Sequence, residues 1–219
     1  MHVIELKSIV KKYKNKNILN SISLEINEGD FLVLCGESGA GKTTLLNIIC
    51  GLESSDNGEV SVLGKNINKM NRKERKLFFR EKVGVLYQDF YLQPQLSVYE
   101  NIALPGYIAG ISKRKIEKRV SYLSKIFGIE EILRQRISEI SGGQAERICI
   151  ARSMFMNPKI VIADEPTNNL DPSNVENIIT LFKKLNEIGT TVVIASHDDR
   201  VKKAANRVVN LDKGGLYEN

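Results

Sequence analysis

The sequence has no tryptophan, only three cysteines and no long apolar run. Cys35, Cys50 and Cys149 are far apart and lie in apolar segments, so we expect reduced thiols and no metal site. No apolar run reaches the roughly 18–20 residues that span a bilayer. The first residues, MHVIELKSIVKKY, lack the apolar core of a secretory signal. These absences predict a cytoplasmic protein without a membrane-spanning helix.

Acidic residues are outnumbered, 26 against 32 lysines and arginines, and the net charge of +6 is concentrated in two segments. Seven basic and two acidic residues fall between Lys69 and Lys82. Five basic residues and one acidic residue fall between Lys113 and Arg119. Nucleic acid, an anionic membrane surface or a solvated helix could each explain these segments. Mixed signs at helical spacing, without an aromatic stacking series, favour solvated helices, with membrane proximity second. We therefore expect no nucleic-acid partner.

Hydrophobic periodicity alternates strands with helices along most of the chain. Strands are expected at 3–6, 22–26, 31–35, 58–64, 83–87, 159–164, 190–196 and 207–211. Helices are expected at 42–52, 71–82, 113–128 and 171–189, and a Ser-x-x-Glu capping box predicts a further helix from residue 97. The longest stretch without a strand signal runs from 88 to about 156.

This order of elements predicts an α/β fold with a mainly parallel central sheet covered by helices on both faces. The two N-terminal strands have the alternating pattern of half-buried antiparallel strands and predict a β subdomain. We expect a single domain over 1–219, in which 1–87 and 157–219 form the core. Residues 88–156 are then an inserted helical subdomain.

The segment GESGAGKT, residues 36–43, matches the phosphate-binding pattern G-x-x-x-x-G-K-[ST]. It follows an apolar strand and opens a helix, where glycines let backbone N–H groups converge on an anion. Lys42 can reach the β- and γ-phosphates, and the Thr43 hydroxyl can bind Mg²⁺. We therefore predict a nucleotide site that includes Gly36, Ser38, Gly39, Ala40, Gly41, Lys42, Thr43 and Thr44.

The segment KIVIADEP, residues 159–166, places two carboxylates at the edge of a sheet where ligands of open α/β folds bind. Asp164 can hold the Mg²⁺ through water, which leaves Glu165 beside the γ-phosphate. A carboxylate at that point can orient and deprotonate an attacking water. The alternative is a solvated glutamate before Pro166, and its adjacency to Asp164 makes that interpretation the weaker one.

Three single residues are further candidates, each with a structural alternative. Gln88 and His197 both end apolar strands at the expected phosphate edge. Gln88 could touch the metal or the water, and His197 could hold the γ-phosphate, the water and Glu165 in line. Tyr13 could stack on adenine, although a tyrosine among lysines is usually a surface residue. The shared position of the first two residues favours a role in the site.

The segment ISGGQ, residues 140–144, places two glycines where a helix is expected to begin. Ser141 and Gln144 form a Ser-x-x-Gln capping box, so a well-capped helix is one interpretation. It does not account for Gly142 and Gly143, which cost stability beside a helix. Bare N–H groups, a hydroxyl and an amide form an anion site, and the upstream loop already encloses its own nucleotide. We therefore expect this segment to bind the γ-phosphate of a second molecule's ATP.

GESGAGKT, Gln88, ISGGQ, VIADE, NNLD and His197 together resemble, in order and spacing, the ATP-binding cassette (ABC) transporter ATPases. The resemblance covers nearly the whole chain and implies the ABC ATPase fold, a form of the P-loop NTPase fold. It implies an Mg²⁺-dependent ATPase whose two copies close head to tail on two ATPs. A separate integral-membrane permease is also implied, received by the helical subdomain and the segment after Gln88. The protein would then be peripheral on the inner face of the cell membrane.

The resemblance assigns roles to particular residues of this chain. Tyr13 is implied to stack on adenine and His197 to be the switch histidine. Residues 168–171 are implied to link the two sites, and Asp171, which ends them, is counted among the nucleotide-binding residues. The residues implied to act across the dimer are Ser141, Gly142, Gly143 and Gln144. Departures from the family pattern are Ile140 for leucine, Glu146 where glutamine is common and Asn168 where glycine or serine is common.

Within the family, ADEPTNNLD and YLQPQLSVYENIALP look most like the MacB and LolD type. That type includes lipoprotein-releasing, macrolide-export and antimicrobial-peptide-export cassettes, together with division-associated ATPases. One rival is a soluble ABC protein acting on ribosomes or DNA, which the single phosphate loop and short helical block disfavour. Another is a binding module without useful turnover, which an intact Glu165 disfavours. The transported substrate is not encoded in the chain.

Overall fold

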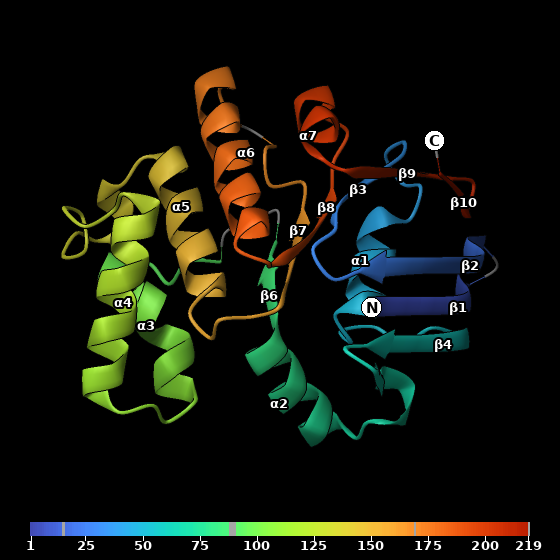
Figure 1. The fold of residues 1–219 in the computed structure, drawn as a ribbon, viewed down its shortest axis with the longest axis horizontal. Helices are drawn as coiled ribbons and strands as arrows, with labels where there is room; N and C mark the ends of the chain where they lie inside the picture. Colours follow the sequence, from blue (N-terminus) through green and yellow to red (C-terminus); the bar gives the residue numbers. More distant parts are fainter. Residues whose placement is uncertain (15, 88–90, 169, 219) are drawn as a thin grey trace.

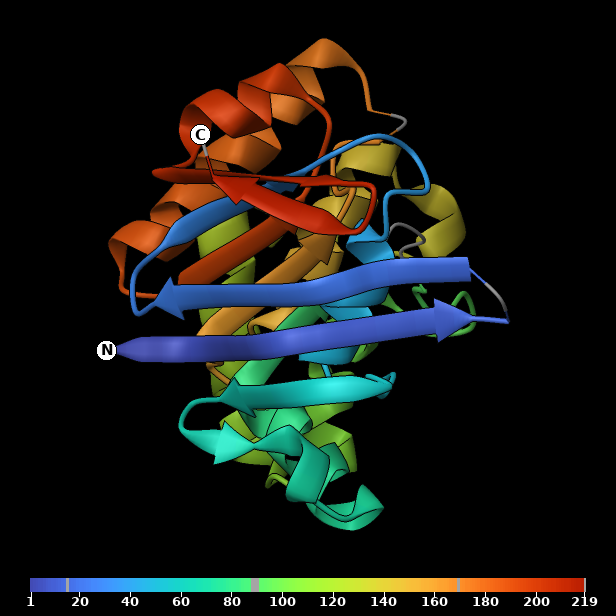
Figure 2. The same ribbon diagram turned by 90° about the vertical axis from the view of Figure 1, so that its right-hand side faces the viewer.

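The computed structural model describes residues 1–14, 16–87, 91–168 and 170–218. The N-terminal strands form an antiparallel sheet in the order β2-β1-β4-β5, whose long strands lie side by side in Figure 2. Its strands are β1 (His2–Tyr13), β2 (Lys16–Asn27), β4 (Asn57–Val62) and β5 (Lys65–Asn66). The expected antiparallel β subdomain is confirmed, and the strand expected at 58–64 belongs to it.

The second sheet has six strands in the order β10-β9-β3-β8-β7-β6. Its strands are β3 (Phe31–Cys35), β6 (Val83–Leu86), β7 (Ile160–Asp164), β8 (Thr191–Ala195), β9 (Arg207–Asp212) and β10 (Gly215–Glu218). All neighbours pair in parallel except β9 and β10. The mainly parallel sheet is therefore confirmed.

Strand β10 was not expected from the sequence. It pairs with β9 through a two-residue turn, Lys213–Gly214, in which both residues have positive φ, 46° and 78°. Such a turn matches the twist of the strands that it joins. Residues 215–218 are too short to carry a periodic pattern, so the pairing with β9 makes them a strand.

Seven α-helices are described, in agreement with the alternating pattern. They are α1 (Lys42–Ile49), α2 (Arg72–Lys82), α3 (Val98–Ile108), α4 (Lys113–Phe127), α5 (Gly142–Ser153), α6 (Pro172–Glu187) and α7 (Asp199–Ala204). Helices α3, α4 and α5 pack together on the side of the molecule opposite the antiparallel sheet (Figure 1). That helical block corresponds to the expected insertion, whose status as a separate subdomain stays a prediction.

The parallel sheet lies between two apolar clusters, because successive side chains of a strand point to opposite faces. Leu32 and Leu34 of β3 belong to the cluster beneath the antiparallel sheet and α1. Phe31, Val33 and Cys35 belong to the cluster shared with α3–α6. The central strand is buried on both faces, which fixes the position of the loop that follows it.

Helix α1 ends earlier than the pattern at 42–52 predicted. Gly51 has a φ of +66°, and a Cβ there would lie 2.4 Å from the Phe79 ring. The chain therefore leaves the helix in the left-handed conformation that glycine permits. Among the described helices, none has both the length and the apolarity needed to cross a bilayer.

Candidate active site

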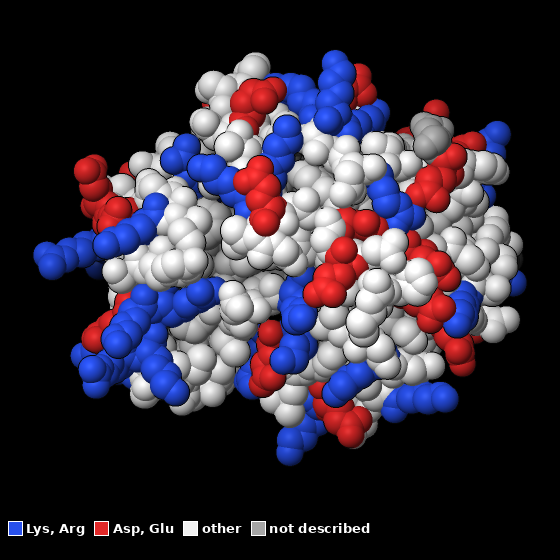
Figure 3. Space-filling view, in the orientation of Figure 1, with Lys and Arg blue, Asp and Glu red and all other residues white. Residues whose placement is uncertain are grey.

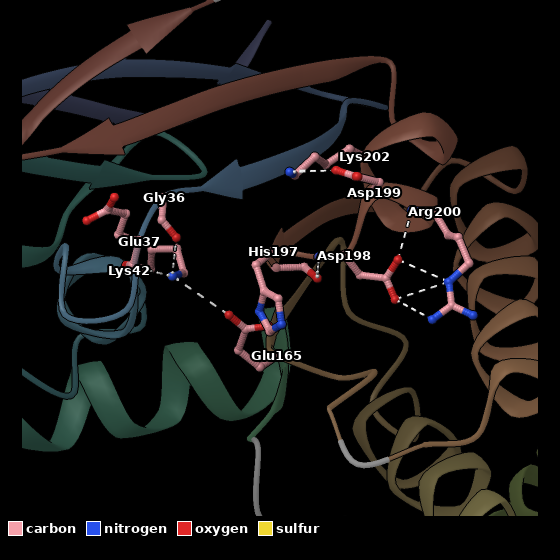
Figure 4. A network of polar contacts seen from close by, with 10 residues as sticks. Gly36, Glu37, Lys42, Glu165, His197, Asp198, Asp199, Arg200 and Lys202 are labelled. Carbon is pink, nitrogen blue, oxygen red and sulfur yellow. Dashed lines mark hydrogen bonds and ion pairs between the residues drawn. The ribbon is translucent and has the colours of Figure 1, made fainter.

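Three strands of the parallel sheet bring their C-terminal ends to one edge. Leu34 of β3 pairs with Ala195 of β8, and Ala195 pairs with Asp164 of β7. The residues that directly follow these strands therefore converge, as Figure 4 shows for Gly36, Glu165 and His197. The sequence predicted this convergence from the apolar strands alone.

A cavity of about 600 Å³ lies at this edge. Eleven of the predicted residues line it: Tyr13, Gly36, Ser38, Gly39, Gly41, Lys42, Thr43, Thr44, Asp164, Glu165 and His197. Asn168, which the resemblance placed in a linking loop, also lines it. Ile18 and Glu37 were not expected. No local signal marks Ile18, because the pairing of β1 with β2 brings it to the cavity.

The phosphate loop, residues 36–43, has glycine at two positions, 36 and 41, where the backbone has a positive φ and neighbouring atoms leave little or no space for a Cβ. Gly36 has a φ of +143°, and a Cβ there would lie 2.2 Å from the Leu211 carbonyl oxygen. Gly41 has a φ of +106°, and its Cβ would lie 3.0 Å from the Ile18 side chain. The loop is therefore pressed against β2 and β9, and its glycines allow backbone N–H groups to turn toward an anion.

Lys42 is held in the cavity with 8% of its surface exposed. Its Nζ donates to the carbonyl oxygens of Gly36 at 2.9 Å and Glu37 at 3.2 Å, which curls the loop around the ammonium. The same Nζ lies 3.7 Å from Glu165 Oε1. Lys42 thus connects the phosphate loop to the carboxylate that follows β7 (Figure 4).

Glu165 lies between a lysine and a histidine. Its Oε2 is 3.0 Å from His197 Nδ1, opposite the contact of its Oε1 with Lys42. The Glu165 side chain is 14% exposed, whereas that of His197 is 69% exposed. The Glu165 backbone has a φ of +46°, and its N–H donates to the Ala195 carbonyl at 2.9 Å. The residue is therefore fixed at the cavity in a left-handed conformation that non-glycine residues rarely adopt.

Asp164 has the character of a cation ligand. Its Oδ1 is buried and has no hydrogen-bond partner among the described residues. Burial raises the pKa of Asp164, while a hydrogen bond with the Thr43 side chain opposes that shift. An orphaned carboxylate oxygen beside a threonine hydroxyl is a donor set that suits Mg²⁺. Asp164 and Thr43 therefore fit the predicted metal, whereas Gln88 lies outside the described residues.

Tyr13 ends β1 at the mouth of the cavity with 46% of its surface exposed. Its hydroxyl donates to the Glu53 carboxylate, in the loop after α1. Tyr13 lines the same cavity as the phosphate loop, and its predicted stacking role stays a prediction. Ala40 lines a smaller neighbouring cavity with Ser38 and Gly39, so its predicted contact with nucleotide also stays a prediction.

The Ser-Gly-Gly-Gln segment, residues 141–144, does not line this cavity among the described residues. The expected capping box is present, since Ser141 N–H donates to Gln144 Oε1 at 2.8 Å and Gln144 N–H donates to Ser141 Oγ at 3.3 Å. A Cβ at Gly142 would meet nothing within 4 Å, whereas one at Gly143 would lie 2.6 Å from Asn174 Oδ1. A side chain at 143 would therefore have to displace the Asn174 amide, whereas the described residues leave space for one at 142.

Asp171 serves within its own chain as the N-cap of α6. Its Oδ1 accepts hydrogen bonds from the N–H groups of Ser173 and Asn174, both at 3.1 Å. The hydrogen bonds from Ser173 and Asn174 lower the pKa of Asp171. The cap was expected from the sequence, and the predicted contact of Asp171 with nucleotide stays a prediction.

Comparison with known proteins adds independent findings. A family model described as ABC transporter matches residues 19–168. Among solved structures, the chain is similar to a dimeric post-hydrolysis state of the ATP-binding cassette MJ0796 bound to ADP and Pi. The two are 35% identical, with a TM-score of 0.90, over 99% of this chain and 97% of that one.

Three related proteins have names that state different functions. The cell division ATP-binding protein FtsE of Streptococcus pneumoniae is 39% identical over 98% of this chain and 94% of its own length. The methionine import ATP-binding protein MetN of Clostridium acetobutylicum is 38% identical over 99% of this chain and 68% of its own length. The lipoprotein-releasing system ATP-binding protein LolD of Bacteroides fragilis is 34% identical over 98% of this chain and 100% of its own length.

Proposed function

The chain belongs to the ABC transporter family, and from that premise we propose that it powers export or extraction by a MacB- or LolD-type permease. Family membership establishes an ATPase that uses ATP with Mg²⁺, pairs with a second copy and works with a membrane permease. The export branch is the finer claim. It is supported by ADEPTNNLD, by YLQPQLSVYENIALP and by the full-length likeness to LolD.

The contact chain from Lys42 through Glu165 to His197 supports a hydrolytic site. We assign Glu165 as the base that orients a water and removes its proton, because it is fixed beside the phosphate loop. His197 holds the second oxygen of Glu165 and restricts its rotation. Lys42 is placed to balance the charge of the phosphates. Mg²⁺, when held by Asp164 and Thr43, neutralises charge on the transferred phosphoryl group.

The open space beside Gly142 is the observation that most favours a site shared by two copies. Gly142 lies exposed at the first turn of α5, and no described residue of its own chain occupies the space of a Cβ. A glycine that the fold does not require is explained by close approach from outside, and a helix N-terminus attracts anions. We propose that Ser141–Gln144 of one copy contact the γ-phosphate bound by the other copy.

Division-associated signalling is the second candidate function, because the cell division protein FtsE is 39% identical over 98% of this chain. In either function the chain would be cytoplasmic and peripheral on the membrane through its partner. The partner's identity separates the two functions.

The test is capture of the membrane partner with Glu165→Gln. Removing the base should slow hydrolysis by about 10²–10⁴-fold while ATP binding remains, so that ATP-bound complexes accumulate. The tagged variant, added with ATP to detergent-solubilised native membranes, should retain a permease with a large periplasmic or extracellular region. Lys42→Ala is the control and should bind neither ATP nor, in an ATP-dependent manner, the permease. Recovery of a division protein would favour the second function, and recovery of ribosomes or DNA would contradict both.

A further inference from the structure

Tyr13 is tied to the loop after α1 by more than one contact. Its hydroxyl donates to the Glu53 carboxylate, and that contact joins residues 40 positions apart in the chain. The hydrogen bond to Glu53 is also the largest cause of a raised pKa for Tyr13. An exposed tyrosine at the end of a strand would otherwise sample several side-chain rotamers.

Lys11 completes this arrangement from the same face of β1, since residues two apart on a strand point the same way. Its Nζ lies 3.0 Å from Glu53 Oε1 and donates to the Ser54 carbonyl oxygen at 2.7 Å. The ammonium also lies 5.4 Å from the centre of the Tyr13 ring. The Lys11 side chain is only 12% exposed, so these contacts replace most of its solvation.

The loop itself is held to β1 by two hydrogen bonds, one between backbone groups and one from a backbone N–H to a side chain. Asp56 N–H donates to the Val10 carbonyl at 2.8 Å, and Lys12 N–H donates to Asp56 Oδ2 at 2.6 Å. Glu53 therefore cannot move away from Tyr13 without breaking this local framework. The tyrosine ring is thus held at its hydroxyl, over its ring and through its backbone.

We propose that Glu53 and Lys11 are positioning residues that hold the Tyr13 ring as a platform for the base of the bound nucleotide. The inference rests on the proposed nucleotide site and deepens it. Ordering the ring in the folded protein removes an entropy loss that binding would otherwise incur. Lys11 also balances the charge of Glu53, so the tether does not place an unpaired carboxylate near a polyanionic ligand.

Steady-state kinetics with Glu53→Ala and Tyr13→Phe provide the first test. Tyr13→Phe keeps the ring and removes the hydroxyl, so both variants should raise KM for ATP by a similar factor, about 3- to 10-fold. Their kcat values should stay within about twofold, because the proposed role of both side chains is to hold the ring and not to act on the phosphates. The double variant should be no worse than either single variant, since both remove the same contact. Glu59→Ala, which removes an exposed glutamate from the same sheet, is the matched control and should change neither value.

Calorimetric binding of ATP and of tripolyphosphate separates positioning of the ring from damage to the phosphate loop. Glu53→Ala should weaken ATP binding about 3- to 10-fold and leave tripolyphosphate binding unchanged. Equal losses for both ligands, or an unchanged KM in Glu53→Ala and Tyr13→Phe, would overturn the inference. Failure of the wild-type protein to bind ATP would instead overturn the proposed nucleotide site. If Glu53→Ala does not fold, Tyr13→Phe and Glu53→Gln provide the same comparison, and Glu53→Gln should lose less because its amide oxygen still accepts the hydroxyl.

Discussion

Glu146 of α5 is a buried carboxyl group in an unfavourable environment. The residue is 1% exposed, and in the part of the chain that the structure describes neither carboxylate oxygen has a hydrogen-bond partner. Burial raises its pKa to about 8, so the group holds a proton at neutral pH. Glutamine is common at this position in the family pattern given above. A glutamine side chain would bury a neutral amide, which has no proton to lose.

Replacing Glu146 with glutamine should stabilise the protein in a pH-dependent way. The carboxyl is neutral in both states below pH about 4.5, whereas above it the unfolded chain loses a proton that the folded chain keeps up to pH about 8. Stability is therefore lost as pH rises through this window. Glu146→Gln should increase the free energy of unfolding by a few kcal/mol at pH 8 and by little at pH 4.5. Urea titrations at both values measure this difference, with the exposed Glu117→Gln as the control.

An equal gain at both pH values would show that side-chain shape, and not the carboxyl proton, determines the effect.

The residue pattern could not have revealed the burial of Glu146. Helical spacing places it near Cys149 and Ile150 of the buried face, but only the packed structure shows that no donor reaches it. Lys42, Glu165 and His197 were different, because each follows a strand or a loop whose position the sheet fixes.

Helices α5 and α6 meet at their N-terminal turns. Asn174 of α6 donates to Asp171 Oδ2 at 2.5 Å, and its amide occupies the place of a Cβ on Gly143 of α5. Gly143→Ala must displace that amide and should lower the free energy of unfolding by about 1–2 kcal/mol. Adding Asn174→Ala should remove most of this extra loss. Thermal melts of the two single variants and the double variant measure the coupling.

Gly142→Ala is the matched comparison on the same helix turn. It adds a methyl where the chain leaves open space, so the melting temperature should stay the same or rise slightly. Hydrolysis of ATP should nevertheless fall by about 10-fold or more, because the methyl would crowd the partner's phosphate at an anion-binding helix terminus. Unchanged hydrolysis with Gly142→Ala would contradict the role proposed for Ser141–Gln144.

At the scale of elements, features that depend on neighbouring residues in the sequence could be predicted. Features that depend on contacts between segments far apart in the sequence could not. The capping boxes at Ser97 and Ser141 and the N-cap at Asp171 follow from residue spacing, and the structure has all three. Strand β10, the contact of Gly143 with Asn174 and the contact of Tyr13 with Glu53 depend on segments that meet only after folding. Their partners lie outside any sequence window.

At the scale of the whole molecule, basic side chains spread over the surface, with a group over the α3–α4 end of the view in Figure 3. Acidic side chains alternate with basic ones over much of the same face, which agrees with the expectation of solvated helices. The phosphate loop and the Ser-Gly-Gly-Gln segment belong to different parts of the chain, and only the first lines the large cavity. In the shared site that we propose, two copies arranged head to tail would bring these parts together.

The most direct test of this shared site is disulfide formation between two different single variants, Ser38→Cys and Ser141→Cys. Ser38 lies exposed in the phosphate loop, Ser141 is exposed at the start of α5, and the native cysteines are buried. When the two variants are mixed and oxidised, a disulfide-linked pair should form in the presence of ATP and not in its absence. Ser121→Cys on α4, in place of Ser141→Cys, should give no such pair. If no ATP-dependent link forms although both variants bind ATP, the two-copy site is contradicted.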